Sequence, residues 1–347
     1  MNSIKQDSFE ENINPDIQNY INLFNKNNEN DIIYLSTTNA FNIKQVNKNT
    51  KTLINLSKVN NIRYINRFFI TVNKKLELDS TYIGCVETFT QRRGRKKIYK
   101  IPILNSFYLI FEFIFLRVFP KVWGLKKIYF TITRGRNRLL SKAETLGRLV
   151  SCGFEIIDHK AINGLLYFVV KKSHEPSTQT ASYGPLYKMP RMGKNGKIIG
   201  VYKFRTMHPY AEFLHDYILK INGYSDTGKP ADDFRLTPWG KILRKYWFDE
   251  VPQLINLFKG ELKLVGVRPI SQRYFQDIPK DLQEMRIKYK PGCIPPYVAF
   301  DRLSNVESVL DAEREYLVMK EKHPLTTDFI CFFKAIFNII FKNKRSA

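Results

Sequence analysis

Apolar residues in the first half of the chain follow two different periods, one typical of strands and one typical of helices. Three short apolar runs, DIIYLSTT, STYIGCVET and GLLYFVVKK, predict buried strands. The residues at helical spacing between the first two runs are Ile62, Ile65, Phe69 and Val72. This alternation predicts an α/β layer with a mostly parallel sheet over residues 31–172, after a polar lead-in at residues 1–30.

A further helix is marked by its start and its end. Ser141 precedes Glu144 by three residues, which is the capping-box spacing, and the helical pattern ends near Gly153. A strand is expected directly after it.

The order of these elements resembles the second half of a Rossmann-like methyltransferase domain. Such domains hold their cofactor on a glycine-rich turn after the first strand, and no G-x-G occurs near the start of this chain. We therefore expect a Rossmann-like, incomplete methyltransferase-like module that acts as a scaffold or regulatory part. An α/β domain of unrelated ancestry is an equal alternative.

An apolar insertion interrupts this module near residues 101–120. Basic clusters flank it, and its polar interruptions are Asn105, Ser106, Glu112 and Arg117. A bilayer span needs about 20 nearly uncharged residues, so the pattern favours a re-entrant or in-plane membrane segment with Lys and Arg at the headgroups. A buried core helix is the alternative.

The second half of the chain has a different pattern. GPLYKMPRMGKNGKIIGVYKFRTM predicts a hairpin of two basic strands with its turn at GKNGK. Thr237 and Pro238 mark a helix start, and Asp249 is the expected N-cap of the next helix, which ends at Gly260. LKLVGVRP then predicts a buried strand that leads to Arg268.

Charge narrows the classes of partner. The 347 residues include 56 Lys and Arg against 32 Asp and Glu, a formal charge of +24. Nucleic acid, an anionic membrane surface and phosphorylated small molecules are the candidates. The four cysteines form no C-x-x-C pair, and the acidic N-terminus lacks a signal-peptide layout, so we expect a reducing cytoplasmic compartment.

Four motifs in order resemble the bacterial sugar transferases, specifically the monotopic polyprenyl-phosphate phosphoglycosyl transferases. They are YKFRTM, the run D-x-R-x-T-x-x-G-x-x-L-R, the run DE-x-P-Q-L-x-N and KGELKLVGVRP. The resemblance implies an α+β catalytic domain over residues 184–347, joined to the first module by a linker at residues 173–183. The family's PG-x-TG turn is replaced here by PGCIPPYVAF, so no site residue is assigned to that stretch.

The resemblance also implies an activity. A sugar-1-phosphate would pass from a UDP-sugar to polyprenyl phosphate, with Asp249 as the nucleophile that forms a phosphosugar intermediate. Glu250 would help to hold Mg2+. The cations implied at the substrate phosphates are Lys203, Arg205, Arg235, Arg244 and Arg268. On the helix pattern alone, the acidic pair is an ordinary N-cap with an acidic first turn, and each arginine has a surface charge or a structural ion pair as its alternative.

The C-terminal segment predicts a basic amphipathic helix that lies in a membrane interface. Its apolar face comprises Phe329, Phe332, Phe333, Ile336, Ile339 and Ile340. Its polar face comprises Lys334, Asn338 and Lys342. Packing against the domain is the alternative.

The expected location is the cytoplasmic face of the bacterial inner membrane, and a homo-oligomer is compatible with the sequence. Two competing functions remain at this point, a basic nucleic-acid-binding protein and a non-catalytic membrane scaffold. The chain lacks a helix-turn-helix, zinc-finger or aromatic RNP signature, which disfavours nucleic acid as a partner.

Overall fold

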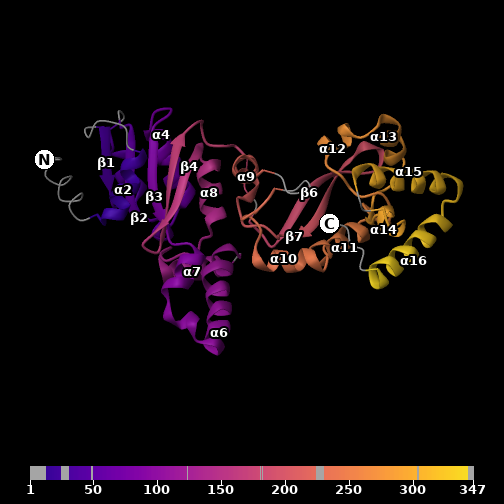
Figure 1. Ribbon diagram of the computed structural model, residues 1–347, viewed down its shortest axis with the longest axis horizontal. Coiled ribbons are helices and arrows are strands. Elements are labelled where there is room, and N and C mark those ends of the chain that lie inside the picture. Colours follow the sequence, from indigo (N-terminus) through magenta and orange to yellow (C-terminus); the bar gives the residue numbers. More distant parts are fainter. Residues whose placement is uncertain are drawn as a thin grey trace. The chain divides into compact units, whose positions relative to one another are not determined.

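The chain forms two compact units (Figure 1). Unit 1 comprises Met1–Gly184 and Met207–Thr237, and unit 2 comprises Pro185–Thr206 and Pro238–Ala347. This division differs from the predicted domain limits, because part of the predicted catalytic domain packs with the N-terminal module. Leu214, for example, is fully buried in the core of unit 1.

The structure is a computed structural model. The residues that it describes are 13–24, 31–47, 50–122, 124–179, 181, 183–223, 230–302 and 305–342. Residues 1–12 and 25–30 of the predicted lead-in, and the last five residues, lie outside this set.

Unit 1 contains one five-stranded sheet. Its strands are β1 Ile32–Leu35, β2 Thr52–Lys58, β3 Thr81–Val86, β4 Phe154–Ile162 and β5 Leu165–Lys172. They lie in the order β1-β2-β3-β5-β4, with β1 to β3 parallel and β5 antiparallel to both of its neighbours. The α/β class is confirmed, and the sheet is mixed. The methyltransferase resemblance stays a prediction.

Strand β2 was missed by the sequence analysis. The apolar pattern around Ile62 and Ile65 suggested helix, whereas helix α4 begins only at Ile65 and runs to Lys75. The preceding residues of β2 pair with β1 and β3. A strand buried between two neighbours has apolar residues on both faces, so a strict alternation is lost and the period is ambiguous.

Helices cover both faces of this sheet. The remaining helices of unit 1 are α2 Pro15–Phe24, α3 Ala40–Lys44, α5 Phe89–Arg95, α6 Pro102–Phe113, α7 Leu125–Thr133, α8 Lys142–Ser151 and α9 His215–Asn222. Successive strand residues face opposite sides, so Phe168 of β5 packs with α4 and α8, whereas Tyr167 packs in the cluster that includes α2.

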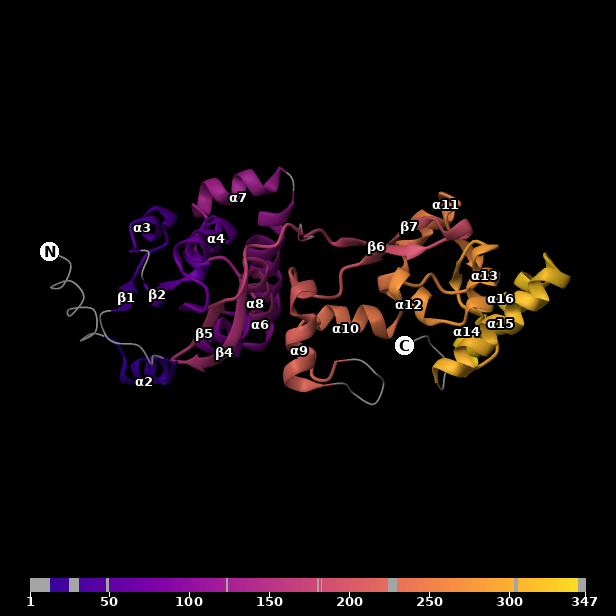
Figure 2. The ribbon, with the colours of Figure 1, turned by 90° about the horizontal axis from the view of Figure 1, so that it is seen from above.

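Helix α2 corrects the prediction of a polar lead-in. Tyr20 and Ile21 are buried, and the Tyr20 hydroxyl donates a hydrogen bond of 2.9 Å to Asp158 of β4. Figure 2 shows α2 on the opposite side of the sheet from α3 and α4. The stretch is polar overall, so its composition did not indicate that one face of the helix, with Tyr20 and Ile21, packs against the sheet.

The helix start predicted at Ser141 is confirmed. The Ser141 side chain accepts a hydrogen bond of 3.1 Å from the Glu144 backbone N–H at the start of α8. Gly153 follows the helix with φ +91°, and a Cβ there would lie 2.1 Å from the carbonyl oxygen of His174. Only glycine fits this end of the helix.

The apolar insertion forms α6 and a π-helical turn at Ile114–Val118, and α7 follows it; this part of the chain projects from the sheet (Figure 1). Several of its apolar residues are exposed, with Phe107 at 71% and Ile110 at 58%. Glu112 is buried and forms ion pairs with Arg92 at 3.3 Å and Lys96 at 3.0 Å. Among the described residues, no helix is long and apolar enough to span a bilayer.

Unit 2 combines a hairpin, a small parallel strand pair and a set of helices. Its elements are β6 Leu186–Met192, β7 Ile198–Phe204, α10 Pro238–Lys245, α11 Gln253–Phe258, β8 Lys263–Val265, α12 Gln272–Asp277, α13 Lys280–Ile287, β9 Gly292–Ile294, α14 Pro296–Ala299, α15 Val306–Lys322 and α16 Thr326–Phe341. The predicted hairpin is confirmed as β6 and β7, and β8 pairs with β9 in parallel.

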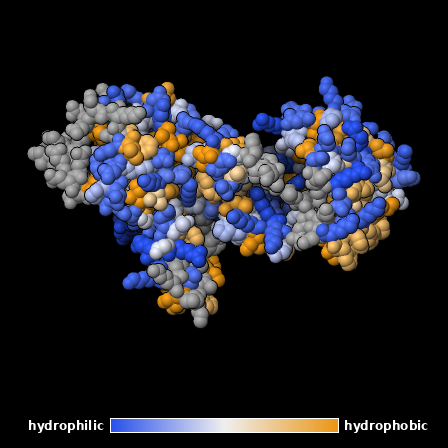
Figure 3. All heavy atoms as spheres, viewed as in Figure 1, coloured by the Kyte–Doolittle hydropathy of each residue, from blue (hydrophilic) through white to orange (hydrophobic). Residues whose placement is uncertain are grey.

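The C-terminal helix α16 differs from the predicted amphipathic pattern. A narrow face of Cys331, Ala335 and Asn338 is buried, and the Asn338 amide donates to the carbonyl oxygens of Val298 and Ala299 at 3.0 and 2.9 Å. Asn338 was expected on the polar face, so that assignment is wrong. Phe332, Ile336 and Ile339 are partly buried. Phe329, Phe333, Phe337, Ile340 and Phe341 are exposed, and Figure 3 shows apolar residues gathered over α16.

The core of unit 1 yields a test of the fold. Phe168 is fully buried against Phe69 and Tyr82, so Phe168→Ala should lower the free energy of unfolding by about 3–5 kcal/mol. Ile157 on the neighbouring strand is 46% exposed, and Ile157→Ala should cost at most about 0.5 kcal/mol. Denaturant unfolding of both variants checks this, and equal losses would contradict the assigned core.

Candidate functional site

The acidic pair lies on a short turn of 3-10 helix, Phe248–Glu250, between α10 and α11. Helix α11 begins three residues after Glu250, with Pro252 at its N-cap, so the prediction of Asp249 as the N-cap is wrong. The end of the helix was predicted correctly, because Gly260 follows with φ +67°. The pair is therefore positioned by the 3-10 turn that precedes α11, and not by the first turn of α11 itself.

The residue before the pair has an unusual backbone. Trp247 has φ 59° and ψ 12°, the left-handed region that a bulky side chain rarely adopts. Such a conformation costs on the order of 1–3 kcal/mol and persists when the surroundings hold it. The Trp247 ring packs against the core of unit 2, which supplies that constraint.

Glu250 is held by several donors at once. Lys203 of β7 approaches its Oε1 at 2.5 Å, and Arg268 approaches the same oxygen at 3.8 Å. Gln253 of α11 donates a hydrogen bond of 3.0 Å to Oε2. The motif DE-x-P-Q-L-x-N thus contains the residue that orients its own glutamate, one turn further along.

Asp249 is buried, with 8% of its surface exposed. Burial raises the pKa of its carboxyl, and the charge of Glu250 adds to this effect, whereas Lys203 and Arg244 oppose it. At a helix N-cap, the position predicted for Asp249, the helix dipole would favour the ionised form. The raised pKa has the opposite direction, because removal of the carboxylate from water outweighs the nearby cations.

Asn256 joins α11 to the hairpin. Its side chain is fully buried, accepts from the Tyr202 N–H at 3.0 Å and donates to the Gly200 carbonyl at 2.8 Å. It also donates to the Glu261 carboxylate at 2.6 Å. These bonds hold β7 beside α11, and Lys203 follows Tyr202 directly in the strand.

A small cavity of about 40 Å³ adjoins Glu250, enough for roughly one water molecule. Lys203, Glu250 and Arg268 line it together with Arg191 and Cys293, which the sequence analysis did not select. The pairing of the two hairpin strands could have indicated Arg191 from the sequence. It pairs with Ile199, so it shares a face with Lys203, which lies four residues further along β7.

Arg268 is anchored from the stretch that replaces the family's usual turn. Its Nη1 donates to the Tyr297 hydroxyl at 3.1 Å, and its carbonyl oxygen accepts from the Arg286 side chain. Gly292 lies so close to Gly266 that a Cβ on Gly292 would be 2.1 Å from the Gly266 nitrogen. This close approach of β9 to β8 lets the two segments share one small site.

The other expected phosphate-binding cations have separate surroundings. Arg244 of α10 donates to Thr206 at 3.0 Å, and its charge acts on Asp249. Arg205 lies over the Tyr187 ring, 5.2 Å from its centroid. Arg235 belongs to unit 1, where Asp233 holds it by hydrogen bonds of 2.8 and 2.7 Å. The structure therefore brings Lys203, Arg244 and Arg268 to the acidic pair.

An apolar stripe borders the acidic pair. Its residues are Phe248 at 55% exposure, Val251 at 46%, Leu254 at 47% and Phe258 at 88%. The spacing of three to four residues places them on one side of the turn and α11. Exposed apolar residues in a continuous row are typical of surfaces that contact a partner or a membrane.

The family model described as bacterial sugar transferase matches residues 169–342, which is half of the chain. The chain belongs to this family. The match includes the acidic pair and all five cations that the resemblance implied, so the predicted family is confirmed.

Curated relatives agree with this assignment. Galactosyl transferase CpsE of Streptococcus agalactiae is 38% identical over 111 residues, covering 31% of this chain and 24% of the relative. The undecaprenyl-phosphate galactose phosphotransferase of Salmonella typhimurium is 35% identical over 124 residues, or 33% of this chain and 25% of the relative. The uncharacterized sugar transferase EpsL of Bacillus subtilis is 36% identical over 106 residues, covering 30% of this chain and 46% of the relative. The chain thus spans a quarter to a half of these relatives.

The buried amide of Asn256 can be tested by its removal. Asn256→Ala breaks three buried hydrogen bonds and should lower the free energy of unfolding by about 3 kcal/mol, at roughly 1 kcal/mol each. Asn305→Ala removes an exposed N-cap of the same unit and should cost about 1 kcal/mol. Equal losses in chemical denaturation would show that Asn256 does not hold α11 to the hairpin.

The raised pKa of Asp249 predicts a pH-dependent stability difference. Its folded pKa lies above that of an unfolded aspartate, about 3.9, so the wild type loses stability as pH rises through the folded value. The amide of Asp249→Asn cannot ionise, so this variant should melt above the wild type at neutral pH. The difference should shrink as pH falls toward about 4. A constant or reversed difference in melting temperature across this range would contradict the raised pKa.

Proposed function

We propose that this protein transfers a sugar-1-phosphate from a UDP-sugar to a polyprenyl phosphate such as undecaprenyl phosphate. In this role it would initiate the synthesis of a membrane-bound glycan such as an exopolysaccharide. The observation that carries the proposal is the pair Asp249 and Glu250, set among Lys203, Arg244 and Arg268 in a member of the bacterial sugar transferase family. Family membership favours this activity over a nucleic-acid-binding protein or a scaffold.

The names of the relatives support the two substrates. The Salmonella relative is named for undecaprenyl phosphate and galactose, and a relative from Aeromonas hydrophila, 37% identical over 97 residues, is named for UDP-N-acetylgalactosamine and undecaprenyl phosphate. An acceptor of the undecaprenyl phosphate class and a donor of the UDP-sugar class follow as the proposal for this chain.

Asp249 is the proposed nucleophile. A carboxylate oxygen of Asp249 attacks the phosphorus that bears the sugar, the bond from this phosphorus to the UMP oxygen breaks, and UMP leaves with the electron pair. A phosphate oxygen of the polyprenyl phosphate then attacks the same phosphorus. The aspartyl oxygen leaves with its electron pair, which restores the carboxylate and releases the polyprenyl-diphosphate sugar.

The surrounding cations address the main electrostatic difficulty of this step. An anionic carboxylate is repelled by an anionic diphosphate unless positive charge lies near both. Lys203 and Arg268 already lie at Glu250, and Arg244 acts on Asp249. Their ammonium and guanidinium groups can donate charge-assisted hydrogen bonds to the phosphate oxygens.

Mg2+ fits the residues at this site. Among the described residues, no group of three His, Cys, Asp or Glu side chains could hold a metal ion. Mg2+ is commonly bound by one or two carboxylates together with substrate phosphates, so Glu250 beside Asp249 is sufficient. When bound, the ion would neutralise charge that develops on the diphosphate. Glu250 already accepts from Gln253, which orients its carboxylate.

Membrane attachment is part of the proposal. The polyprenyl acceptor is a lipid, and the apolar stripe beside the acidic pair is exposed, as is Phe329 of α16 at 69%. We propose that these surfaces and the α6–α7 insertion hold the protein on the cytoplasmic face of the bacterial inner membrane as a monotopic protein. Apolar burial and contacts of Lys and Arg with anionic headgroups would act together.

The decisive experiment removes the nucleophile. Wild-type protein given a UDP-sugar and Mg2+, without polyprenyl phosphate, should release about one equivalent of UMP and gain the mass of a phosphosugar. Asp249→Asn should show neither signal, because an amide cannot attack as an anion, and its turnover should fall by several orders of magnitude. Glu250→Gln should retain some turnover and require more Mg2+.

Glu321→Gln is the matched control, since Glu321 is an exposed acidic residue of unit 2 that pairs with Lys288 at 3.5 Å. It should release UMP like the wild type. Release of UMP by Asp249→Asn at a rate near wild type would place the nucleophile elsewhere. Recovery of most of the full-length protein in the soluble fraction would contradict the membrane attachment.

A further inference from the structure

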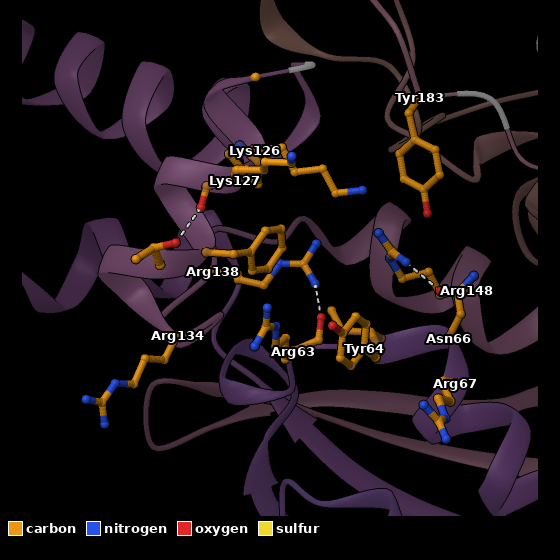
Figure 4. Close-up of a pocket in the computed structure, with 15 residues that line it drawn as sticks. Arg63, Tyr64, Asn66, Arg67, Lys126, Lys127, Arg134, Arg138, Arg148 and Tyr183 are labelled. Carbon is orange, nitrogen blue, oxygen red and sulfur yellow. Dashed lines mark hydrogen bonds between the residues drawn. The ribbon is translucent and has the colours of Figure 1, made fainter.

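Unit 1 contains a large basic pocket that the proposed reaction does not use. It has a volume of about 1310 Å³ and lies between α4, α7 and α8 (Figure 4). Its basic lining residues are Arg63, Arg67, Lys126, Lys127, Arg134, Arg138 and Arg148. No Asp or Glu is among the described residues that line it.

Most of this positive charge is not neutralised by carboxylates. Arg148 pairs with Glu144 at 2.8 Å, and the other six basic residues form no ion pair among the described residues. Like charges gathered around one concave space repel one another, and a low-dielectric wall strengthens that repulsion. Burial lowers the pKa of Arg138, and the positive charge of Arg148 lowers it further. An anion in the pocket would reduce the repulsion among these cations and would favour the charged form of Arg138.

Arg148 carries a second, independent indication of a ligand. The residue is 4% exposed, and it donates to Asn66 at 2.5 Å and to Glu144 at 2.8 Å. Its Nε is buried and has no hydrogen-bond partner among the described residues. A buried donor without a partner is destabilising, so native proteins rarely leave one unless a ligand or water accepts from it.

The side chains are arranged around the middle of the pocket. Figure 4 shows the guanidinium groups of Arg138 and Arg148 and the hydroxyl of Tyr183 turned toward this middle. Arg134 points away from it. The Arg63 guanidinium lies 5.3 Å from the Tyr64 ring centroid and 5.8 Å from that of Phe130, so aromatic rings help to fix the direction of the charge.

A row of basic residues on a +24 protein is more often a solvated surface than a site. Two observations argue against that alternative here, the concave shape of the pocket and the buried Arg148 Nε. A solvated surface would hydrate every donor, and it would not bury one arginine among six other cations.

We propose that this pocket binds the phosphate group of an anionic ligand. The phosphate would accept from the Arg138 and Arg148 guanidiniums inside the pocket, with Arg67 and Lys127 at its rim. Two sources supply the same chemistry, a phospholipid headgroup and a soluble phosphate compound. The exposed Ile128 and Ile132 on the same helix as Lys127, at 53% and 65%, favour the headgroup. The inference does not depend on the proposed reaction of unit 2.

The test uses the full-length protein and a double substitution at the rim. Arg67 and Lys127 are exposed and form no ion pair among the described residues, so Arg67→Gln with Lys127→Gln should leave the fold intact. The first arm measures co-sedimentation with phosphatidylcholine vesicles with and without phosphatidylglycerol. The second measures calorimetric binding of inorganic pyrophosphate to protein in neutral detergent. The rim variant should weaken binding in at least one arm by roughly tenfold or more.

Lys74→Gln with Lys160→Gln is the charge-matched control, because both lysines are exposed in unit 1 and neither lines the pocket. The control should bind like the wild type, and Arg138→Gln should repeat the loss from inside the pocket. A loss with vesicles alone identifies a lipid headgroup, and a loss with pyrophosphate identifies a soluble phosphate. Equal weakening in the rim and control variants, or binding that is unchanged in both pocket variants, would overturn the proposal.

Discussion

The site of unit 2 depends on one buried amide. Asn256 makes a donor and acceptor pair with the backbone of β7, so α11 and the hairpin cannot slide past each other without leaving buried polar groups unpaired. This constraint keeps Lys203 at Glu250, although 47 residues separate them in the chain. The motif that begins with the acidic pair therefore contains both the candidate reactive group and the residue that fixes its surroundings.

The electrostatics of the two carboxylates differ because their burial and partners differ. Glu250 accepts hydrogen bonds from Lys203 and Gln253, and Arg268 forms a longer ion pair with it at 3.8 Å. Asp249 is more deeply buried, and burial raises its pKa. Neighbouring residues in one turn thus have different tasks available to them. Glu250 is held in place by its partners, whereas the charged form of Asp249 is costly and therefore reactive.

The local parts of the fold were predictable. The hairpin followed from GKNGK between two strands, the start of α8 followed from Ser141 and Glu144, and α10 begins at Pro238 as expected. Strand β2, helix α2 and the buried side of α16 were not predictable in the same way. In each case the periodicity of apolar side chains indicated the wrong element or the wrong buried face. The reason is that a second element packs on a face whose sequence pattern is polar or ambiguous.

The sequence by itself determined the family, the excess of positive charge, the acidic pair and most of the local starts and turns, because caps, turns and motifs act within a few residues. Only the tertiary structure decided that Asp249 is buried away from a helix cap, that Gln253 and Lys203 hold Glu250, and that Arg235 pairs with Asp233 in the other unit. It also revealed the basic pocket around Arg148. The physical reason is that burial and the choice of partner depend on which distant segments pack together, and no local period records that choice.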